Sequence, residues 1–136
     1  MAGSLLLTRN NDFIGKEGFQ GLKVWQKNKQ LATQVYKITD NGIFRTNCRL
    51  KDIIRRSSVS TPSIIAESDE RDTDKEAMRH LYIAKGSAIE LLTRLIIAYK
   101  INYLNEVASK KLEEKFLKIP GMLSKLISVC SKTFNR

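Results

Sequence analysis

The side chains that could carry out covalent chemistry are few, and their spacing matches no known catalytic arrangement. A serine-rich stretch fills positions 57–63, and His80 is the only histidine that could act as a base beside it. Neither a G-x-S-x-G nor an S-x-x-K motif is present, so the local geometry that activates a serine nucleophile is missing. Small hydroxyl side chains also permit close helix packing, which is the role that we predict for this stretch. The sequence therefore predicts a protein without enzymatic activity.

Metal-ligating residues are equally sparse. Cys48 and Cys130 are the only cysteines, and they form no C-x-x-C pair, which argues against a zinc site or a disulfide framework. Acidic residues alternate from Asp72 onward, as in a calcium loop, but Ala77 and Ile83 stand where an EF-hand needs glycine and glutamate. We expect no metal and no cofactor, and a reducing, cytoplasmic location.

Net charge is the strongest feature of the composition. The chain has 24 basic and 14 acidic residues, a formal charge of +10, and six of the acids lie within positions 67–76. Outside that segment, 22 basic residues stand against 8 acidic ones. Such an excess attracts polyanions, of which nucleic acid is the commonest in a cytoplasm. The alternative interpretation, that the charge serves only solubility, has comparable weight.

Four segments carry apolar residues at helical spacing, and together they must position any functional surface. With 136 residues, two prolines and seven glycines, the chain predicts a single, mainly helical domain. The expected helices cover residues 22–39, 50–67, 73–103 and 105–130. Short connections between four helices predict an all-α, up-down-up-down four-helix bundle.

Local signals set the ends of these helices. The sequence from Thr73 to Glu76 matches a capping box, and Asn105 can cap the last helix. Pro62 predicts a kink or a break in the second helix, and Pro120 followed by glycine predicts a bend in the fourth.

The domain limits follow from the apolar pattern. We expect a flexible arm over residues 1–18, the bundle over 19–132 and a tail over 133–136. The three leucines at positions 5–7 are too few for a signal peptide. Arg94 and Lys100 interrupt the longest apolar run, so no membrane span is expected.

The third helix is apolar on two sides, which predicts self-association. Its main stripe faces the core, while Ile83, Ile97 and Ile101 form a second line that we take as a candidate oligomer interface. Lys85 falls close to the main stripe, where a charged amine needs a partner. Glu67 is the predicted partner for an ion pair and Glu90 the reserve. Equally, the lysine stem could carry the ammonium group out to water.

Basic residues recur at helical spacing along the second and fourth helices. Such stripes are typical of the outward face of a bundle and also of a phosphate-binding surface. Because guanidinium groups bind phosphate with two hydrogen bonds, the arginines of the second helix are the stronger candidates. The candidate nucleic-acid-binding residues are Arg45, Arg49, Lys51, Arg55, Arg56, Lys111, Lys115, Lys118 and Lys125. No RNP motif, KH loop or helix-turn-helix signature indicates base-specific recognition.

Several of these segments, taken together, resemble a known family. Residues 19–27 (FQGLKVWQK), 54–67 (IRRSSVSTPSIIAE) and 81–91 (LYIAKGSAIEL) are similar to motifs of the bacterial four-helix-bundle proteins encoded in 23S rRNA intervening sequences. The resemblance implies a left-handed bundle that assembles as a ring-like homopentamer and has no established enzymatic activity. A related branch comprises accessory proteins of diversity-generating retroelements, which bind a reverse transcriptase and nucleic acid through a basic surface.

Two functions therefore remain open at the level of the sequence. The first is a non-enzymatic, homo-oligomeric bundle that associates with RNA or with a nucleoprotein. The second is a protein-interaction scaffold or accessory subunit, for example of a reverse transcriptase, that does not bind RNA directly.

Overall fold

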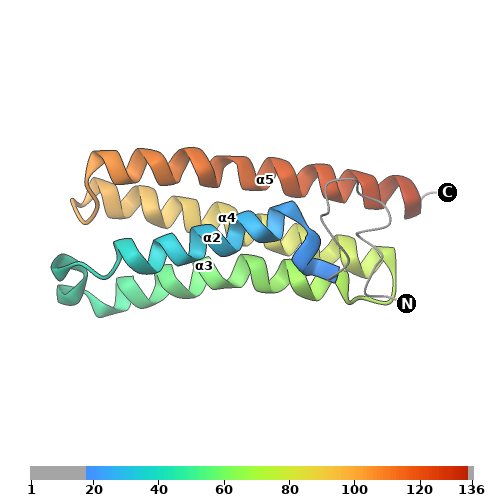
Figure 1. Ribbon diagram of the computed structural model, residues 1–136, viewed down its shortest axis with the longest axis horizontal. Helices are drawn as coiled ribbons and strands as arrows, with labels where there is room; N and C mark the ends of the chain where they lie inside the picture. Colours follow the sequence, from blue (N-terminus) through green and yellow to red (C-terminus); the bar gives the residue numbers. More distant parts are fainter. Residues whose placement is uncertain (1–17, 135–136) are drawn as a thin grey trace.

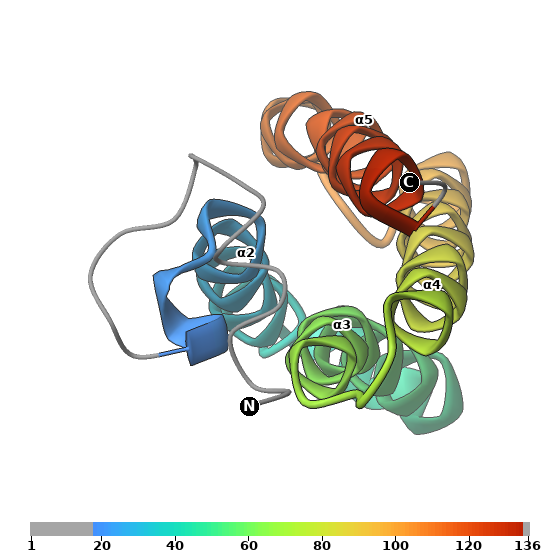
Figure 2. The same cartoon turned by 90° about the vertical axis from the view of Figure 1, so that its right-hand side faces the viewer.

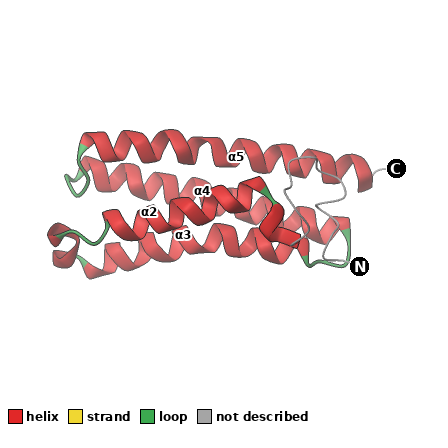
Figure 3. Ribbon diagram, in the orientation of Figure 1, coloured by secondary structure: helices red, strands yellow, loops and turns green. Residues whose placement is uncertain are grey.

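The computed structural model describes residues 18–134, which form four long helices running alternately up and down (Figure 1). A short 3-10 helix, η2 (Gly18–Gly21), leads into α2 (Lys23–Ile38), and a second, η3 (Gly42–Thr46), precedes α3 (Cys48–Asp69). The longest elements, α4 (Asp74–Lys100) and α5 (Glu106–Phe134), follow. Every regular element of the described residues is helical (Figure 3), which confirms the predicted all-α fold.

The predicted arm and tail are largely outside the described residues. Only Gly18 of the arm is described, and it already belongs to η2. At the other end, α5 continues to Phe134, so the predicted start of the tail at residue 133 was two residues too early.

The helices follow one another around the bundle axis in chain order (Figure 2). Consequently α2 lies beside α3 on one side and α5 on the other, and α4 closes the ring between α3 and α5. The seam between α2 and α5 is the most loosely packed of the four.

The core is built from the apolar stripes that the sequence predicts. Each of the four helices contributes side chains that are no more than 2% exposed, for example Val35 of α2, Ile54 of α3, Leu81 of α4 and Phe116 of α5. The burial of these side chains provides the main driving force for packing four amphipathic helices.

Helix ends follow the predicted caps. The hydroxyl oxygen of Thr73 accepts a hydrogen bond from the amide of Glu76 at 3.1 Å, and the side-chain oxygen of Asn105 accepts one from the amide of Ala108 at 2.8 Å. Both bonds satisfy amides that have no partner within the helix.

The third predicted helix, by contrast, ends earlier than residue 103. Asn102 has a positive φ of 66°, and the amide of Tyr103 donates to the carbonyl of Ala98 at 2.8 Å. This pattern is a Schellman ending with asparagine in the left-handed position, where only glycine is more common. It stops α4 at Lys100.

Neither proline breaks its helix. α3 continues through Pro62 and α5 through Pro120, so of the predicted kink or break at Pro62 the break does not occur. Proline removes one backbone hydrogen bond, but Pro62 is buried. We attribute the continuity of α3 to this burial, because packing of the Pro62 side chain compensates for the missing backbone hydrogen bond.

Truncation of the central leucines of α4 tests the assigned helical phase. Leu92 and Leu95 are 9% and 3% exposed, so replacing either with alanine should cost about 2–5 kcal/mol of unfolding free energy through lost burial and a residual cavity. Ile89 on the same helix is 47% exposed, and Ile89→Ala is the matched control. Urea unfolding followed by circular dichroism measures the difference. Equal midpoints for Leu95→Ala and Ile89→Ala would contradict the packing.

Candidate nucleic-acid interface

The seam between α2 and α5 contains two adjoining hollows with volumes of about 250 and 490 Å³. Gln34 and Lys115 line both hollows and so make them one continuous feature, which we call the lysine groove. Its charged lining residues are Lys27, Lys37, Lys111, Lys115 and Lys118. Among residues 18–134, no carboxylate lines either hollow. A groove with five ammonium groups and no acid is a strongly attractive site for a polyanion.

Helical spacing explains how each helix contributes its lysines. Lys27 and Lys37 are ten residues apart on α2, with Gln30 and Gln34 between them, so all four project from one side of the helix. Lys111, Lys115 and Lys118 repeat at intervals of four and three residues along α5. The antiparallel arrangement of α2 and α5 then brings the two rows face to face across the loosely packed seam.

None of the five groove lysines forms an ion pair with another residue of the described chain, whose three ion pairs lie elsewhere. The neighbouring Lys110, in contrast, bonds to the Glu106 carboxylate with a nitrogen–oxygen distance of 2.9 Å. The hydrogen bond from Lys110, assisted by its charge, lowers the pKa of Glu106 below its ordinary value. Lys110 therefore has a carboxylate partner among the described residues, whereas the five groove lysines have none there.

Arg55, one of the favoured phosphate ligands, serves the fold instead. Its Nε donates to the hydroxyl of Thr39 at 2.8 Å, and its Nη2 donates to the carbonyl of Tyr36 at 3.1 Å. The guanidinium also lies 4.6 Å from the centre of the Tyr36 ring. It thus satisfies a carbonyl at the end of α2 and clamps α3 to that end. We therefore remove Arg55 from the candidate interface.

The other basic residues of the predicted α3 cluster do not form a carboxylate-free surface. Arg56 forms an ion pair with Asp52 at 3.1 Å. Arg49 and Lys51 border a hollow of about 440 Å³ that Asp52 also lines. Arg45 is exposed in η3, and its side chain lines none of these hollows. The nearby acid weakens the attraction of this region for phosphate.

On α5, the structure brings together three of the four predicted lysines. Lys125 is exposed one heptad beyond Lys118 but does not line the lysine groove. Lys27 and Lys37 were missed as candidates, because sequence spacing assigns them only to the polar side of the first helix. Only the position of α2 beside α5 makes them part of a site.

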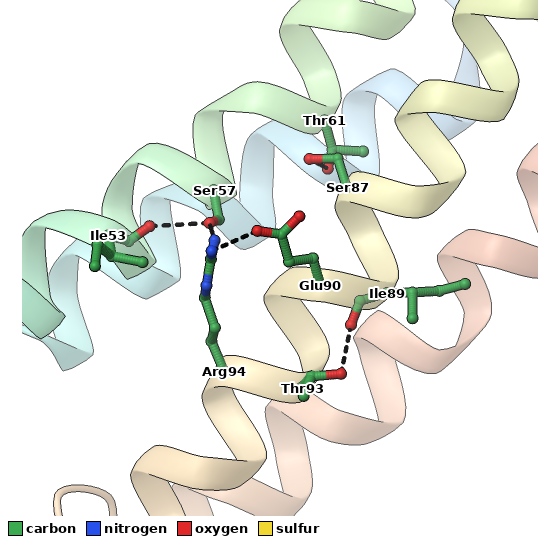
Figure 4. A network of polar contacts seen from close by, with 8 residues as sticks. All are labelled: Ile53, Ser57, Thr61, Ser87, Ile89, Glu90, Thr93 and Arg94. Atoms are coloured by element: carbon green, nitrogen blue, oxygen red, sulfur yellow. Dashed lines mark hydrogen bonds and ion pairs between the residues drawn. The ribbon is translucent and has the colours of Figure 1, made fainter.

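Two residues of the serine-rich stretch, Ser57 and Thr61, lie in the seam between α3 and α4, where they form polar contacts (Figure 4). Ser57 donates to the carbonyl of Ile53 at 2.9 Å and accepts a hydrogen bond from Arg94, which also pairs with Glu90. One turn away, Thr61 bonds to the hydroxyl of Ser87 at 3.2 Å. Ser57 thus meets a guanidinium, which cannot act as its base, and the network serves helix packing.

The predicted ion pair between Lys85 and Glu67 is not formed. Lys85 is half-buried and Glu67 is exposed, while the reserve partner Glu90 pairs with Arg94. The ion pairs found among the described residues do not include Lys85. The lysine is close enough to the edge of the core for its ammonium group to reach water, which removes the need for a buried carboxylate.

The predicted oligomer-interface residues are exposed on α4. Ile83, Ile97 and Ile101 have exposed fractions of 51%, 49% and 46%. No described helix combines the length and apolarity needed to cross a membrane. Residues 18–134 also contain no group of three or more histidine, cysteine, aspartate or glutamate side chains placed to hold a metal ion.

Fold and groove together define a four-helix bundle with facing rows of lysines between its first and last long helices, where no described lining residue is a carboxylate. The family model of the 23S rRNA-intervening sequence proteins matches residues 20–125, and the chain belongs to this family. A search of curated proteins found no match.

The solved structures confirm the fold. The chain is similar to a protein of unknown function from the S23 ribosomal protein family of Bacteroides thetaiotaomicron VPI-5482, whose crystal structure was determined at 1.70 Å resolution. The TM-score is 0.70 at 20% sequence identity, and the match covers 76% of this chain and 97% of that one.

Two adjacent arginines provide a test of the assigned roles. Arg55→Ala removes charged hydrogen bonds that join α3 to the end of α2, and it should lower the unfolding free energy by about 1–3 kcal/mol. Arg56→Ala removes only an exposed ion pair and should change it by less than about 1 kcal/mol. Thermal unfolding of both variants measures the difference. If Arg55→Ala unfolds like the parent, the clamp assigned to Arg55 is incorrect.

Proposed function

We propose that this protein is a non-enzymatic, homo-oligomeric bundle that associates with RNA by binding backbone phosphates in the lysine groove. The observation that carries the proposal is the convergence of five lysines and two glutamines at the open seam between α2 and α5, where no described residue contributes a carboxylate to the lining. The family name, 23S rRNA-intervening sequence protein, is consistent with an RNA context.

The lining of the groove favours phosphates over bases. Lysine ammonium groups interact with phosphate as point charges and carry no information about sequence. No aromatic residue of the described part of the chain lines either hollow, so these residues provide no stacking platform of the kind that single-strand binders use for bases. Gln30 and Gln34 add hydrogen-bonding groups on the α2 side. We therefore expect binding to many RNAs with little sequence preference.

Self-association would increase the affinity. Each copy contributes one lysine groove, and linked grooves on one RNA convert later contacts into intramolecular ones. A protein that binds RNA in this way acts in the cytoplasm by binding alone and needs no catalytic group.

The second candidate is a protein-interaction scaffold without direct RNA binding. It is favoured by the exposed isoleucines of α4, because apolar surface of this kind is typical of protein contacts. Such a scaffold could serve a nucleic-acid-processing enzyme. The two candidates differ in whether purified protein alone binds RNA.

Charge-matched variants test the groove. One variant combines three substitutions that remove three positive charges from the groove: Lys111→Gln, Lys115→Gln and Lys118→Gln. Because the slope of log affinity against log salt is about −0.7 per phosphate contact, the combined variant should flatten that slope by about 2 for single-stranded RNA. Fluorescence anisotropy with several unrelated RNAs measures this slope.

The control protein combines Arg45→Gln, Arg49→Gln and Arg56→Gln, which also removes three charges but leaves the groove intact. It should lose clearly less affinity and keep most of the salt slope. An equal loss in both proteins would show that net charge, and not the groove, controls binding. Absence of binding at about 50 mM salt, where phosphate contacts are strong, would favour the scaffold function.

A further inference from the structure

A further hollow lies between α2 and α3, on the other side of α2 from the lysine groove (Figure 2). Its volume is about 590 Å³, inside the range of about 300–1,000 Å³ that is typical of ligand pockets. Phe19, Trp25 and Tyr36 contribute to its lining, and we call it the aromatic groove. Tyr36 is 43% exposed. The groove thus presents an aromatic side chain to solvent, which the described lining residues of the lysine groove do not.

Two aromatic rings of this groove lie next to cations. The Lys29 ammonium lies 5.3 Å from the centre of the Trp25 ring, and the Arg55 guanidinium lies 4.6 Å from the centre of the Tyr36 ring. Trp25 and Tyr36 are eleven residues, or about three turns, apart, so both project from the same side of α2. Aromatic rings combined with basic side chains are the means by which single-strand binders stack bases and attract the backbone.

The charge around the aromatic groove fits a polyanion. α2 contains four lysines and no aspartate or glutamate. Lys29 is the only charged residue among the described residues that line the groove. A neutral apolar partner gains nothing from this excess of cations, whereas the phosphates of an RNA strand are attracted by it. Charge complementarity therefore favours RNA as the occupant.

The aromatic groove and the lysine groove are separated only by the outer face of α2. Three pairs of consecutive residues divide between them, the first of each pair lining the aromatic groove and the second the lysine groove: Lys29 and Gln30, Thr33 and Gln34, and Tyr36 and Lys37. A helix with its side chains is about 10–12 Å across, a distance that a few nucleotides of single-stranded RNA span. One strand can therefore reach both grooves.

We propose that bases of a single-stranded RNA stack in the aromatic groove while phosphates of the same strand bind in the lysine groove, with the strand crossing the outer face of α2. This inference deepens the proposed function and rests on it. Because every base has a π face, stacking adds affinity with little sequence preference, in agreement with the binding expected of the lysine groove.

The dimensions and polar groups of the aromatic groove suit bases. Its α2 wall from Trp25 to Tyr36 extends about 16 Å at 1.5 Å per residue, and stacked nucleotides repeat at about 3.4 Å along a strand, so the wall has room for more than one base. The hydroxyls of Thr33 and Ser63 donate to carbonyls of their own helices at 3.0 and 2.8 Å. Their oxygens can still accept hydrogen bonds from the amino groups of bases.

The fluorescence of Trp25 tests the proposal, because it is the only tryptophan of the chain. A base that stacks on the indole ring quenches its emission. We expect a short oligouridylate to quench the parent protein, and a sugar–phosphate oligomer of equal length without bases to bind but leave the emission unchanged. The oligouridylate should bind more tightly by about 5- to 150-fold for each stacked base. This advantage should persist at high salt, because stacking releases no counterions.

Two matched tyrosine variants locate the stacking. Tyr36→Leu keeps an apolar side chain but removes the ring, and it should lower the affinity for the oligouridylate by about 5- to 150-fold. The affinity for the base-free oligomer and the salt slope should not change. Tyr82→Leu, at a position on α4 that is 57% exposed, should bind both probes like the parent. Circular dichroism checks that both variants fold, and quenching of the parent requires no substitution.

The other outcomes separate base stacking from phosphate binding. Equal affinities for the two probes, with no change in Trp25 emission, would overturn base stacking and leave the lysine groove standing; the same result is expected if a second copy or another protein covers the aromatic groove. An equal loss of affinity in Tyr82→Leu and Tyr36→Leu would also overturn it. Failure of both probes to bind at about 50 mM salt would overturn the proposed function together with this inference.

Discussion

The rest of the structure depends on the burial of the α4 apolar stripe between α3 and α5. This stripe contains both alanines and leucines, for example Ala84, Ala88, Leu91 and Leu95, and all four are buried. Small residues let the neighbouring helices approach, and the leucines fill the space between them. With α3, α4 and α5 fixed in this way, α2 packs mainly on α3, and the α2–α5 seam stays open.

Polar contacts then set how the helices lie against one another. Ser57 and Thr61 turn small hydroxyls toward α4, where Arg94 and Ser87 meet them. The Arg94 guanidinium is half-buried and bonds across the seam between α4 and α3. It therefore favours one rotation of α4 relative to α3, because another rotation would leave its N–H donors without acceptors. Arg55 acts similarly at the end of α2. Two of the arginines in this basic chain therefore contribute to the fold, and net charge alone overstates the surface available to a polyanion.

The apolar and basic surfaces are separated by α2. One side of this helix carries Lys27 and Lys37 toward α5, and the other side carries Trp25 and Tyr36 toward α3. The basic lining on the α5 side of α2 and the apolar lining on its α3 side therefore do not share a residue.

The sequence by itself determined the helices, their core stripes, the caps at Thr73 and Asn105, and the family, because these depend on periodicity and on local hydrogen bonds. It did not determine the continuity of α3 through Pro62, since that depends on burial of the proline side chain in the folded protein. It also did not reveal the role of Arg55, whose hydrogen-bond partners lie sixteen and nineteen residues away, and it paired Lys85 with Glu67, an ion pair that is not found among the described residues. The lysine groove was decided only by the tertiary structure: spacing finds one row on α5, but the second row on α2 becomes part of a site only when the two helices pack side by side.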